Sequence, residues 1–353
     1  MERIVECVPN FSEGRNPVVI ESIANAVRGV EGVTLLDIDP GKGVNRTVMT
    51  FAGEPGPVAE AAFQSVKRAS ELIDMRYHSG EHPRIGATDV LPFVPVSGIS
   101  LVECAEIART LARRVYGELG IPVYCYQAAA LKPGHKNLAD CRKDGYESLR
   151  ARIVNPDQMP DLGGGVFTCQ AAKSGATVIG ARNFLVAVNY NLDTDSSLIA
   201  RRVASIVREK GRIKREGDIW TGTIVRNEHG APLFVPGTLK GCKAIGWYIP
   251  EYGFSQVSMN ITDVNATGLL DAFCEVSRVA SFFGAKVTGT EIIGLVPKKV
   301  IIDAGSEILF KGKDAKYLNE IEIIETAVNY LGLSRVSVFD YKRKILEFAL
   351  KNS

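Results

Sequence analysis

The stretch DMRYHSGEHPRIGATDV, residues 74–90, contains two of the four histidines in the chain. His78 and His82 lie four residues apart, with Glu81 between them and a Pro-Arg pair directly after. Side chains of these types could hold a metal ion, or an imidazole with an ordinary pKa of about 6.5 could carry a proton at neutral pH. The third reading is a pair of solvent-exposed histidines at a helix end, where the helix dipole favours them.

The metal reading depends on a helix. HSGEH fits the H-x-x-E-H pattern of inverzincins, in which helical spacing aims both imidazoles at one ion. Gly80 lies inside the motif and Pro83 follows it. Glycine costs about 1 kcal/mol in a helix, and the residue before proline avoids the helical region. No downstream acidic motif stands out as a third ligand, so no metal is expected, and a zinc hydrolase stays open only as an alternative.

A catalytic base in a loop fits the same residues. EHPRIGATD places one histidine beside an arginine, a glutamate and an aspartate in a turn rich in proline and glycine. Fixed loops of this kind commonly carry catalytic groups. The histidine stretch alone leaves this reading and the exposed pair both open.

The composition narrows the class of protein. The chain has 353 residues, 46% apolar and 23% charged, with a net charge of +2. Domains of roughly 100–200 residues are typical, so one large or two medium domains are expected. The seven cysteines are scattered without a CxxC pair. The N-terminus has no apolar core as long as that of a signal peptide, and no apolar run is long enough for a membrane helix. We expect a cytoplasmic protein with reduced thiols and with neither a nucleic-acid nor a membrane partner.

The first half alternates strands and helices in the order β-α-β-β-α-β. This is the split βαβ order of ferredoxin-like domains. Ser100 and Glu103 have capping-box spacing for a third helix. The predicted strands are 3–9, 33–39, 46–53, 88–96 and 121–127, and the predicted helices begin at residues 17, 55 and 101.

The second half repeats that order. Its predicted strands are 181–192, 243–250, 254–262 and 286–297, and its predicted helices are 195–211, capped by Asp195 or Ser196, and 266–284. The segment 212–242 interrupts the repeat, and an inserted hairpin that turns at NEHG, residues 227–230, is expected there. Between the halves, a helix near 137–153 and a loop over 160–175 are expected. The fold class is α/β (α+β), with subdomains 1–178 and 179–304 and a helical extension, 305–353, that packs on the second subdomain.

Several strands carry amide or carboxylate side chains on one face. One interpretation without a functional role is an antiparallel sheet with one face in water. Because both halves show such faces, two sheets that face each other across a polar cleft are favoured instead. The residues are Gln256, Ser258, Asn260 and Thr262 on one strand, Asn189 and Asn191 on another, and Asp37 and Asp39 in the first half.

Six stretches resemble the glutamate formiminotransferase family in the same order along the chain. They are VECVPNFSEGR (5–15), Asn45–Arg46, ELIDMRYHSGEHPRIGATDVLPFVPV (71–96), GATVIGARNFLVAVNYNL (175–192), KAIGWYIPEYGFSQVSMN (243–260) and GTEIIGLVPKKVIIDA (289–304). In vertebrates this family forms the N-terminal part of formiminotransferase-cyclodeaminase. The chain is expected to be too short to include the cyclodeaminase part.

The resemblance implies a reaction and a fold. The reaction moves the formimino group of N-formimino-L-glutamate to N5 of tetrahydrofolate, giving 5-formiminotetrahydrofolate and L-glutamate in histidine degradation. The fold is two α/β subdomains with a tunnel between their sheets, and a homodimer is implied. Two alternatives stay open: formyl transfer from N-formylglutamate to tetrahydrofolate, and a folate-binding protein without turnover.

The family's catalytic histidine lies in its GEHPR motif, which corresponds to His82. We expect His82 to take the N5 proton, and Asp39 either to orient His82 or to hold the formimino nitrogen. His78 lies outside the motif and receives no chemical role.

Both substrates carry glutamyl carboxylates, and guanidinium groups bind carboxylates in a bidentate manner. Arg46, Arg84 and Arg182 are therefore candidate substrate clamps. Asn10 either binds substrate or shapes its loop, and Asn45 enters the substrate site through the matched Asn45–Arg46 pair.

The family's folate loop corresponds to residues 163–177, where the residues before GATVIGAR depart from the vertebrate form. Three consecutive glycines allow close approach to a flat pterin. A flexible linker between domains is the alternative reading. The candidate folate-binding residues are Gly163, Gly164, Gly165, Val166, Phe167, Lys173, Ser174 and Gly175.

Overall fold

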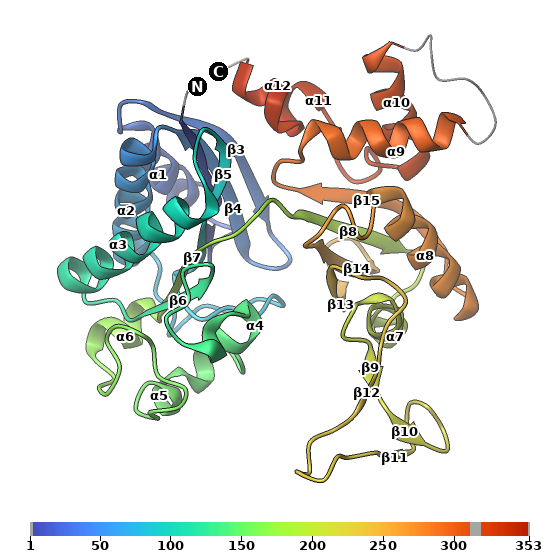
Figure 1. The fold of residues 1–353 in the computed structure, drawn as a ribbon, viewed down its shortest axis with the longest axis horizontal. Helices are drawn as coiled ribbons and strands as arrows, with labels where there is room; N and C mark the ends of the chain where they lie inside the picture. The colour runs from blue at the N-terminus through green and yellow to red at the C-terminus, as the bar shows by residue number, and fades with distance from the viewer. Residues whose placement is uncertain (1–2, 311–318, 352–353) are drawn as a thin grey trace. The chain divides into compact units, whose positions relative to one another are not determined.

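A computed structural model describes residues 3–310 and 319–351 of the chain. Two compact units divide between Phe184 and Leu185, and each contains its own β-sheet (Figure 1). The prediction of a mixed α/β protein with two sheet-containing units is confirmed. The facing of the two sheets and a tunnel between them stay predictions.

The first unit is built on a seven-stranded sheet. Two short strands, β1 and β2, lie end to end between β4 and β5. With β3 on the outer side of β4, the order β3, β4, β1/β2, β5 is that of a ferredoxin-like sheet, extended by β7 and β6, which run parallel to β5. The strands are β1 (Ile4–Cys7), β2 (Asn10–Phe11), β3 (Val33–Gly41), β4 (Arg46–Gly53), β5 (Thr88–Ser97), β6 (Val123–Gln127) and β7 (Thr177–Ala181).

Three long helices cover one face of this sheet: α1 (Pro17–Arg28), α2 (Pro55–Leu72) and α3 (Leu101–Leu119). The predicted capping box of α3 is confirmed, because Ser100 Oγ accepts the Glu103 N–H at 3.2 Å and Glu103 accepts the Ser100 N–H at 2.9 Å. Gly120, with φ of 65°, ends α3 in the left-handed conformation that glycine allows.

The opposite face carries short elements where one helix and one loop were predicted. They are η1 (Pro133–His135), α4 (Leu138–Cys141), η2 (Tyr146–Ser148), α5 (Leu149–Arg152) and α6 (Cys169–Ser174). The single helix near 137–153 is wrong because Gly145, with φ of 70°, breaks the helical run. The uninterrupted loop over 160–175 is also wrong, because Thr168 caps α6 by accepting the Ala171 N–H at 3.0 Å.

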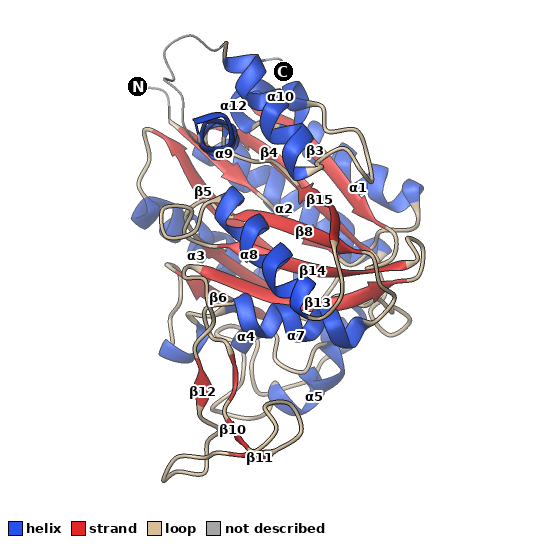
Figure 2. Ribbon diagram, turned by 90° about the vertical axis from the view of Figure 1, so that its right-hand side faces the viewer, coloured by secondary structure: helices blue, strands red, loops and turns tan. Residues whose placement is uncertain are grey.

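The second unit repeats the ferredoxin-like order as β13-β14-β8-β15, with every pair antiparallel. The strands are β8 (Val186–Leu192), β13 (Cys242–Ile249), β14 (Phe254–Ile261) and β15 (Val287–Ile293). Figure 2 shows α7 (Ser197–Val207), which Ser196 caps, and α8 (Leu269–Phe282) lying over one face of this sheet. The predicted strand 181–192 is too long, because Ala181 pairs in parallel with Phe93 and so belongs to the first sheet.

The predicted insertion hairpin contains two small ladders. β9 (Arg212–Ile213) pairs with β12 (Phe234–Val235), and β10 (Arg215–Glu216) pairs with β11 (Thr223–Ile224). The predicted turn at NEHG is confirmed, since the Asn227 N–H donates to the Ala231 carbonyl at 2.9 Å.

The C-terminal helices share the apolar core of the second unit. They are α9 (Lys298–Phe310), α10 (Glu320–Leu331), α11 (Tyr341–Lys344) and α12 (Leu346–Lys351). Ile301, Ile324 and Ile345 are fully buried in one cluster with Tyr190 and Val257 of the sheet. The helices therefore complete this core, while the division of the chain at residues 178 and 304 stays a prediction.

None of the helices in the described ranges combines the length and the apolar character that crossing a bilayer requires.

Helix α7 packs closely on β13 because Gly246 has no side chain. A Cβ at Gly246 would lie 2.2 Å from the Ala200 carbonyl carbon. We predict that Gly246→Ala lowers the free energy of unfolding by about 1–3 kcal/mol through overpacking, measured by urea denaturation.

Gly117→Ala in α3 is the matched control, because nothing lies within 4 Å of a Cβ there. This change should raise the free energy of unfolding by up to about 1 kcal/mol through helix propensity. Equal effects of the two substitutions would contradict the close packing at Gly246.

Candidate functional site

A buried carboxylate stands at the start of β5. Asp89 is 0% exposed, and its Oδ1 accepts the Ile85 N–H at 2.9 Å. Its Oδ2 accepts hydrogen bonds from Arg46 and, at 2.7 Å, from Arg142. Burial alone would raise the pKa of Asp89, but the two guanidinium groups outweigh it and bring the pKa to about 2. Asp89, Arg46 and Arg142 form what we call the Asp89 cluster.

The Asp89 cluster holds two positive charges against one negative charge. Arg46 is 7% exposed, and its Nε donates to Asn10 Oδ1 at 3.1 Å, which links β4 to β2. Burial lowers the pKa of Arg46, Arg142 lowers it further, and Asp89 opposes both. The excess positive charge favours an anion, or a neutral rather than a protonated base, beside the cluster.

The loop that carries His82 is fixed by backbone contacts. The Ala87 N–H donates to the Ser174 carbonyl at 2.8 Å, and the Ala176 N–H donates to the Ile85 carbonyl at 3.1 Å. A Cβ on Gly86 would lie 2.2 Å from the Ala176 carbonyl oxygen. Residues 174–176, just before β7, therefore hold the end of the loop by backbone hydrogen bonds. The close contact leaves no room for a side chain at residue 86.

His82 itself is half-buried. Its Nδ1 lies 2.7 Å from the Pro83 carbonyl oxygen. A carbonyl can only accept, so we assign the proton to Nδ1, which makes Nε2 the basic atom of the neutral ring. Burial lowers the pKa of His82 well below its usual value, and the charges of Arg46 and Arg142 lower it further against the opposing Asp89. The imidazole is therefore neutral at neutral pH.

His78 has a different position. Its Nε2 lies 3.0 Å from the Asn45 carbonyl oxygen, and its Nδ1 accepts the Arg84 Nε–H at 3.2 Å. Burial lowers its pKa as well. These contacts connect two loops, so the reading of His78 as an exposed histidine is wrong.

The histidine motif is not helical, because α2 ends at Leu72 and residues 73–87 form turns and bends. The helical spacing that the inverzincin pattern requires is therefore missing. Over residues 3–310 and 319–351, no group of three or more His, Cys, Asp or Glu side chains is placed to share a metal ion.

Two predicted substrate residues have partners within the protein. Asn45, at a left-handed φ of 50°, accepts the Gly14 N–H at 3.0 Å and donates to the Ser79 carbonyl at 2.8 Å through its side-chain amide. Arg84 donates to both carboxylate oxygens of Glu147, at 2.8 and 2.7 Å. These contacts shape the site, and the substrate contacts of both residues stay predictions.

Strand register places Asp39 and Asn10 on the same face of the first sheet. Asp39 on β3 and Asn10 on β2 both lie opposite Val48 of β4, one on each side. Arg46, two residues before Val48, shares this face. Asp39 is therefore about 10 Å from Asn10 across two strand spacings, and its catalytic role stays a prediction.

Arg182 and Arg142 of the Asp89 cluster both lie near the phenol of Tyr126. Tyr126 is 2% exposed, and burial raises its pKa to about 12 although the charges of Arg182 and Arg142 oppose the rise. Arg182 also hydrogen-bonds to Tyr126. The two arginines thus lie near one phenol at the ends of β6 and β7.

The predicted folate residues separate into two groups. Gly163 and Gly164 lie in contact range of Tyr116 and Met159, Val166 is exposed, and the Phe167 ring lies 4.8 Å from the Arg150 guanidinium. The second group, Lys173, Ser174 and Gly175, lies against the His82 loop and the end of α2. Because Gly165 and all the others belong to the first unit, the reading as a linker between domains is wrong.

The polar face of the second sheet is a buried network. Gln256 donates to Asn191 at 2.8 Å and accepts from Trp247 Nε1 at 3.1 Å, and both amide side chains are 1% exposed. Asn189 donates to Glu291 at 3.3 Å. The reading as a water-exposed face is wrong for these residues.

Sequence reasoning noted Asp89 only as a neighbour of the histidine in EHPRIGATD, and it missed Arg142 and Glu147. Asp89 had a signal, since it is the one charged residue in the strand TDVLPFVPV. Arg142 and Glu147 had none, because they lie among other polar residues and find their partners 53 and 63 positions away.

Two family models match the chain. The model for the formiminotransferase domain, N-terminal subdomain, matches residues 4–182, and the model for the formiminotransferase domain matches residues 187–351. The division between the compact units falls in the gap between these matches.

Curated relatives show the same similarity. The chain is 40% identical to formimidoyltransferase-cyclodeaminase of Rattus norvegicus over 353 residues, which cover all of the chain and 61% of that protein. It is 40% identical to glutamate formimidoyltransferase of Streptococcus pyogenes serotype M1 over 91% of the chain and 98% of that protein. The corresponding enzyme of Thermoplasma acidophilum is 37% identical over 87% of the chain and 92% of that protein. The chain thus spans about three-fifths of the rat relative and nearly all of the shorter ones.

We predict that Asp89→Asn lowers the free energy of unfolding at pH 7 by about 3 kcal/mol, because two buried guanidinium groups lose their counter-charge. The pKa of Asp89 is about 2 in the folded protein and about 3.9 in an unfolded chain. The stabilisation is therefore complete above about pH 4 and is lost as the pH falls toward about 2. Urea denaturation at pH 7 and pH 3 measures both effects.

Asp157→Asn removes an exposed carboxylate of the same unit and serves as the control. It should leave the free energy of unfolding within about 0.5 kcal/mol of the wild type. If Asp89→Asn were as stable as this control at pH 7, the Asp89 cluster would not hold the site.

Proposed function

The chain belongs to the formiminotransferase family, and from this premise we propose that it transfers the formimino group of N-formimino-L-glutamate to N5 of tetrahydrofolate. The products are 5-formiminotetrahydrofolate and L-glutamate, in histidine degradation. The observation that carries the proposal is the half-buried imidazole of His82 beside the positively charged Asp89 cluster, with a pKa lowered first by burial and then by the two arginines. The two shorter relatives, named glutamate formimidoyltransferase, support the donor.

The reaction needs one group that first accepts and then returns a proton. N5 of tetrahydrofolate loses its proton as it attacks the formimino carbon, and a tetrahedral intermediate forms. The glutamate nitrogen must gain a proton before it leaves. His82 performs both steps through Nε2, since Nδ1 is held by the Pro83 carbonyl.

The Asp89 cluster sets the balance of these two steps. Burial lowers the pKa of His82 most, and the charges of Arg46 and Arg142 lower it further, so the base is present in its unprotonated, active form before the reaction. The same lowered pKa makes the protonated ring a stronger acid, which favours expulsion of the glutamate amine. The lowered pKa also makes His82 a weaker base when it accepts the N5 proton in the first step.

Substrate carboxylates bind to the cationic side of the site. Arg46 and Arg182 are the proposed clamps, with Asn10 held beside Arg46 by their hydrogen bond. Arg84 and Asn45 act through the loop that they shape. Asp39 holds the formimino nitrogen or orients His82.

Tetrahydrofolate is the co-substrate. Residues Lys173, Ser174 and Gly175 are the better-supported part of its proposed site, because they adjoin the His82 loop. The stretch Gly163–Phe167 is the second part. From the family resemblance we further propose a cytoplasmic homodimer.

We predict that His82→Ala lowers kcat/KM about 10²–10⁴-fold, the contribution of a positioned general base. Initial rates are followed by folate absorbance with N-formimino-L-glutamate as donor. N-formyl-L-glutamate is tested in parallel, and rapid turnover of the formyl donor alone would replace the proposed reaction by formyl transfer.

His229→Ala is the matched control, because His229 is an exposed histidine in the insertion turn of the second unit. It should keep wild-type kcat/KM. Wild-type turnover by His82→Ala would remove the assignment of the base, and no turnover by the wild type with either donor would favour a binding protein.

A further inference from the structure

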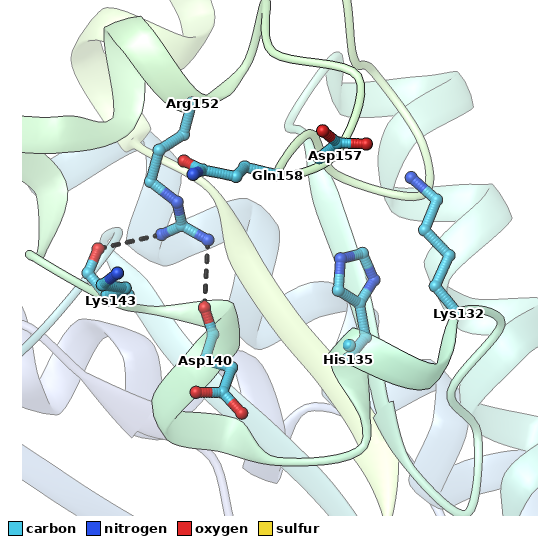
Figure 3. Close-up of a pocket in the computed structure, with 8 residues that line it drawn as sticks. Lys132, His135, Asp140, Lys143, Arg152, Asp157 and Gln158 are labelled. Carbon is cyan, nitrogen blue, oxygen red and sulfur yellow. Dashed lines mark hydrogen bonds between the residues drawn. The ribbon is translucent and has the colours of Figure 1, made fainter. Parts of the chain in front are cut away.

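A separate pocket lies in the first unit among residues 132–158. Its volume is about 210 Å³, and Lys132, His135, Lys143, Arg152 and Gln158 are among the residues that line it (Figure 3). We call it the Arg152 pocket. None of the residues of the Asp89 cluster lines it.

Arg152 is the most buried charge in this pocket. It is 5% exposed, and its guanidinium donates to three backbone carbonyls, of Lys143 at 3.1 Å, Asp140 at 3.2 Å and Cys141 at 2.8 Å. Carbonyls satisfy hydrogen bonds but carry no full charge. In the described part of the chain no carboxylate forms an ion pair with Arg152, so its guanidinium is held by neutral carbonyls.

The imidazole of His135 and the guanidinium of Arg152 both contact the ring of Tyr124. Tyr124 lies 5.2 Å below the Arg152 guanidinium and meets the His135 ring edge-on at 5.1 Å. His135 Nδ1 lies 2.8 Å from Asp161 Oδ2, and this carboxylate also accepts the Cys125 N–H at 2.7 Å. The Asp161 contact fixes the His135 ring and leaves Nε2 as its remaining polar atom. Figure 3 shows the ring standing between Lys132 and the side of the pocket formed by Arg152 and Gln158.

Two lysines add positive charge. Lys132 Nζ donates to the Met159 carbonyl at 3.2 Å, and Lys143 is exposed at the rim. Neither forms an ion pair with a residue in the described ranges. Asp140 and Asp157 also line the pocket, but the Asp140 carboxylate accepts from Asn137 at 3.0 Å and turns away from Arg152 in Figure 3. Three cationic side chains, Arg152, Lys132 and Lys143, thus stand against two carboxylates, those of Asp140 and Asp157, so the lining has one excess positive charge.

We propose that the Arg152 pocket binds a small oxyanion through a carboxylate or phosphate group. The group is held by charge-assisted hydrogen bonds from Lys132 and Lys143, and it compensates the charge of Arg152. The inference stands independently of the proposed transfer reaction, because it uses none of the residues assigned to it.

Size and charge limit the ligand. A volume of about 210 Å³ is below the roughly 300–1,000 Å³ of sites that enclose drug-sized molecules, so the pocket is too small to enclose a nucleotide or a pterin. A metal cation is excluded by the cationic lining. A phosphate ion or a short dicarboxylate fits both limits.

The test uses isothermal titration calorimetry on the full chain at low ionic strength, with inorganic phosphate and succinate as separate probes. We expect saturable binding of at least one probe with one equivalent per chain. Binding of phosphate alone would identify the ligand group as a phosphate, and binding of succinate alone would identify it as a carboxylate. Binding of both would show that the pocket accepts either oxyanion. If neither phosphate nor succinate shows saturable binding, the proposal is overturned.

The double variant Lys132→Met/Lys143→Met locates the site without disturbing buried Arg152, whose replacement could unfold the unit. It should weaken binding about tenfold or more, since two charge-assisted donors are lost. The matched control is Lys67→Met/Lys136→Met, which removes the same charge from exposed positions outside the pocket. Equal affinities of the two double variants would place the anion elsewhere and overturn the proposal.

Discussion

The candidate site depends on one buried carboxylate between two guanidinium groups. Asp89 is shut off from water, so its charge is tolerated only because Arg46 and Arg142 donate to it. Through its other oxygen it holds the Ile85 N–H. One side chain thus ties together the start of β5, the start of β4, the short helix α4 and the loop that carries His82.

The same interaction sets the electrostatics of the site. Burial lowers the pKa of His82 most, and the excess positive charge of the cluster lowers it further, so both favour the neutral ring. The charge of the cluster also suits a substrate rich in carboxylates. The Asp89 cluster thus contributes both to the loop geometry and to the proton affinity of His82, which favours His82 over His78 as the proposed proton carrier. His78 instead uses both ring nitrogens within the protein.

Local patterns predicted most of the fold. The helix beginning at Leu101 follows from the Ser100–Glu103 capping box, and the duplicated strand order follows from hydrophobic alternation. One error concerns long-range pairing: residues 177–181 join the first sheet because they pair in parallel with β5. The errors at 137–153 and 160–175 were local, at the left-handed Gly145 and the Thr168 cap. The Asp89 cluster was out of reach because the partners of Asp89 lie 43 and 53 positions away and no local spacing relates them. The loop-base reading came from the neighbours of the histidine, and family resemblance then selected His82 over the alternatives.

The central claim is that burial and the charge of the Asp89 cluster together keep His82 neutral, and NMR titration of the histidine ring resonances tests it most directly. The His82 signals are assigned by their loss in a variant without this ring. The account predicts a His82 pKa below about 6.5 in the wild type, and a higher value in Arg142→Gln because one nearby positive charge is removed. A wild-type pKa at or above about 6.5, or one that Arg142→Gln leaves unchanged, would contradict the account.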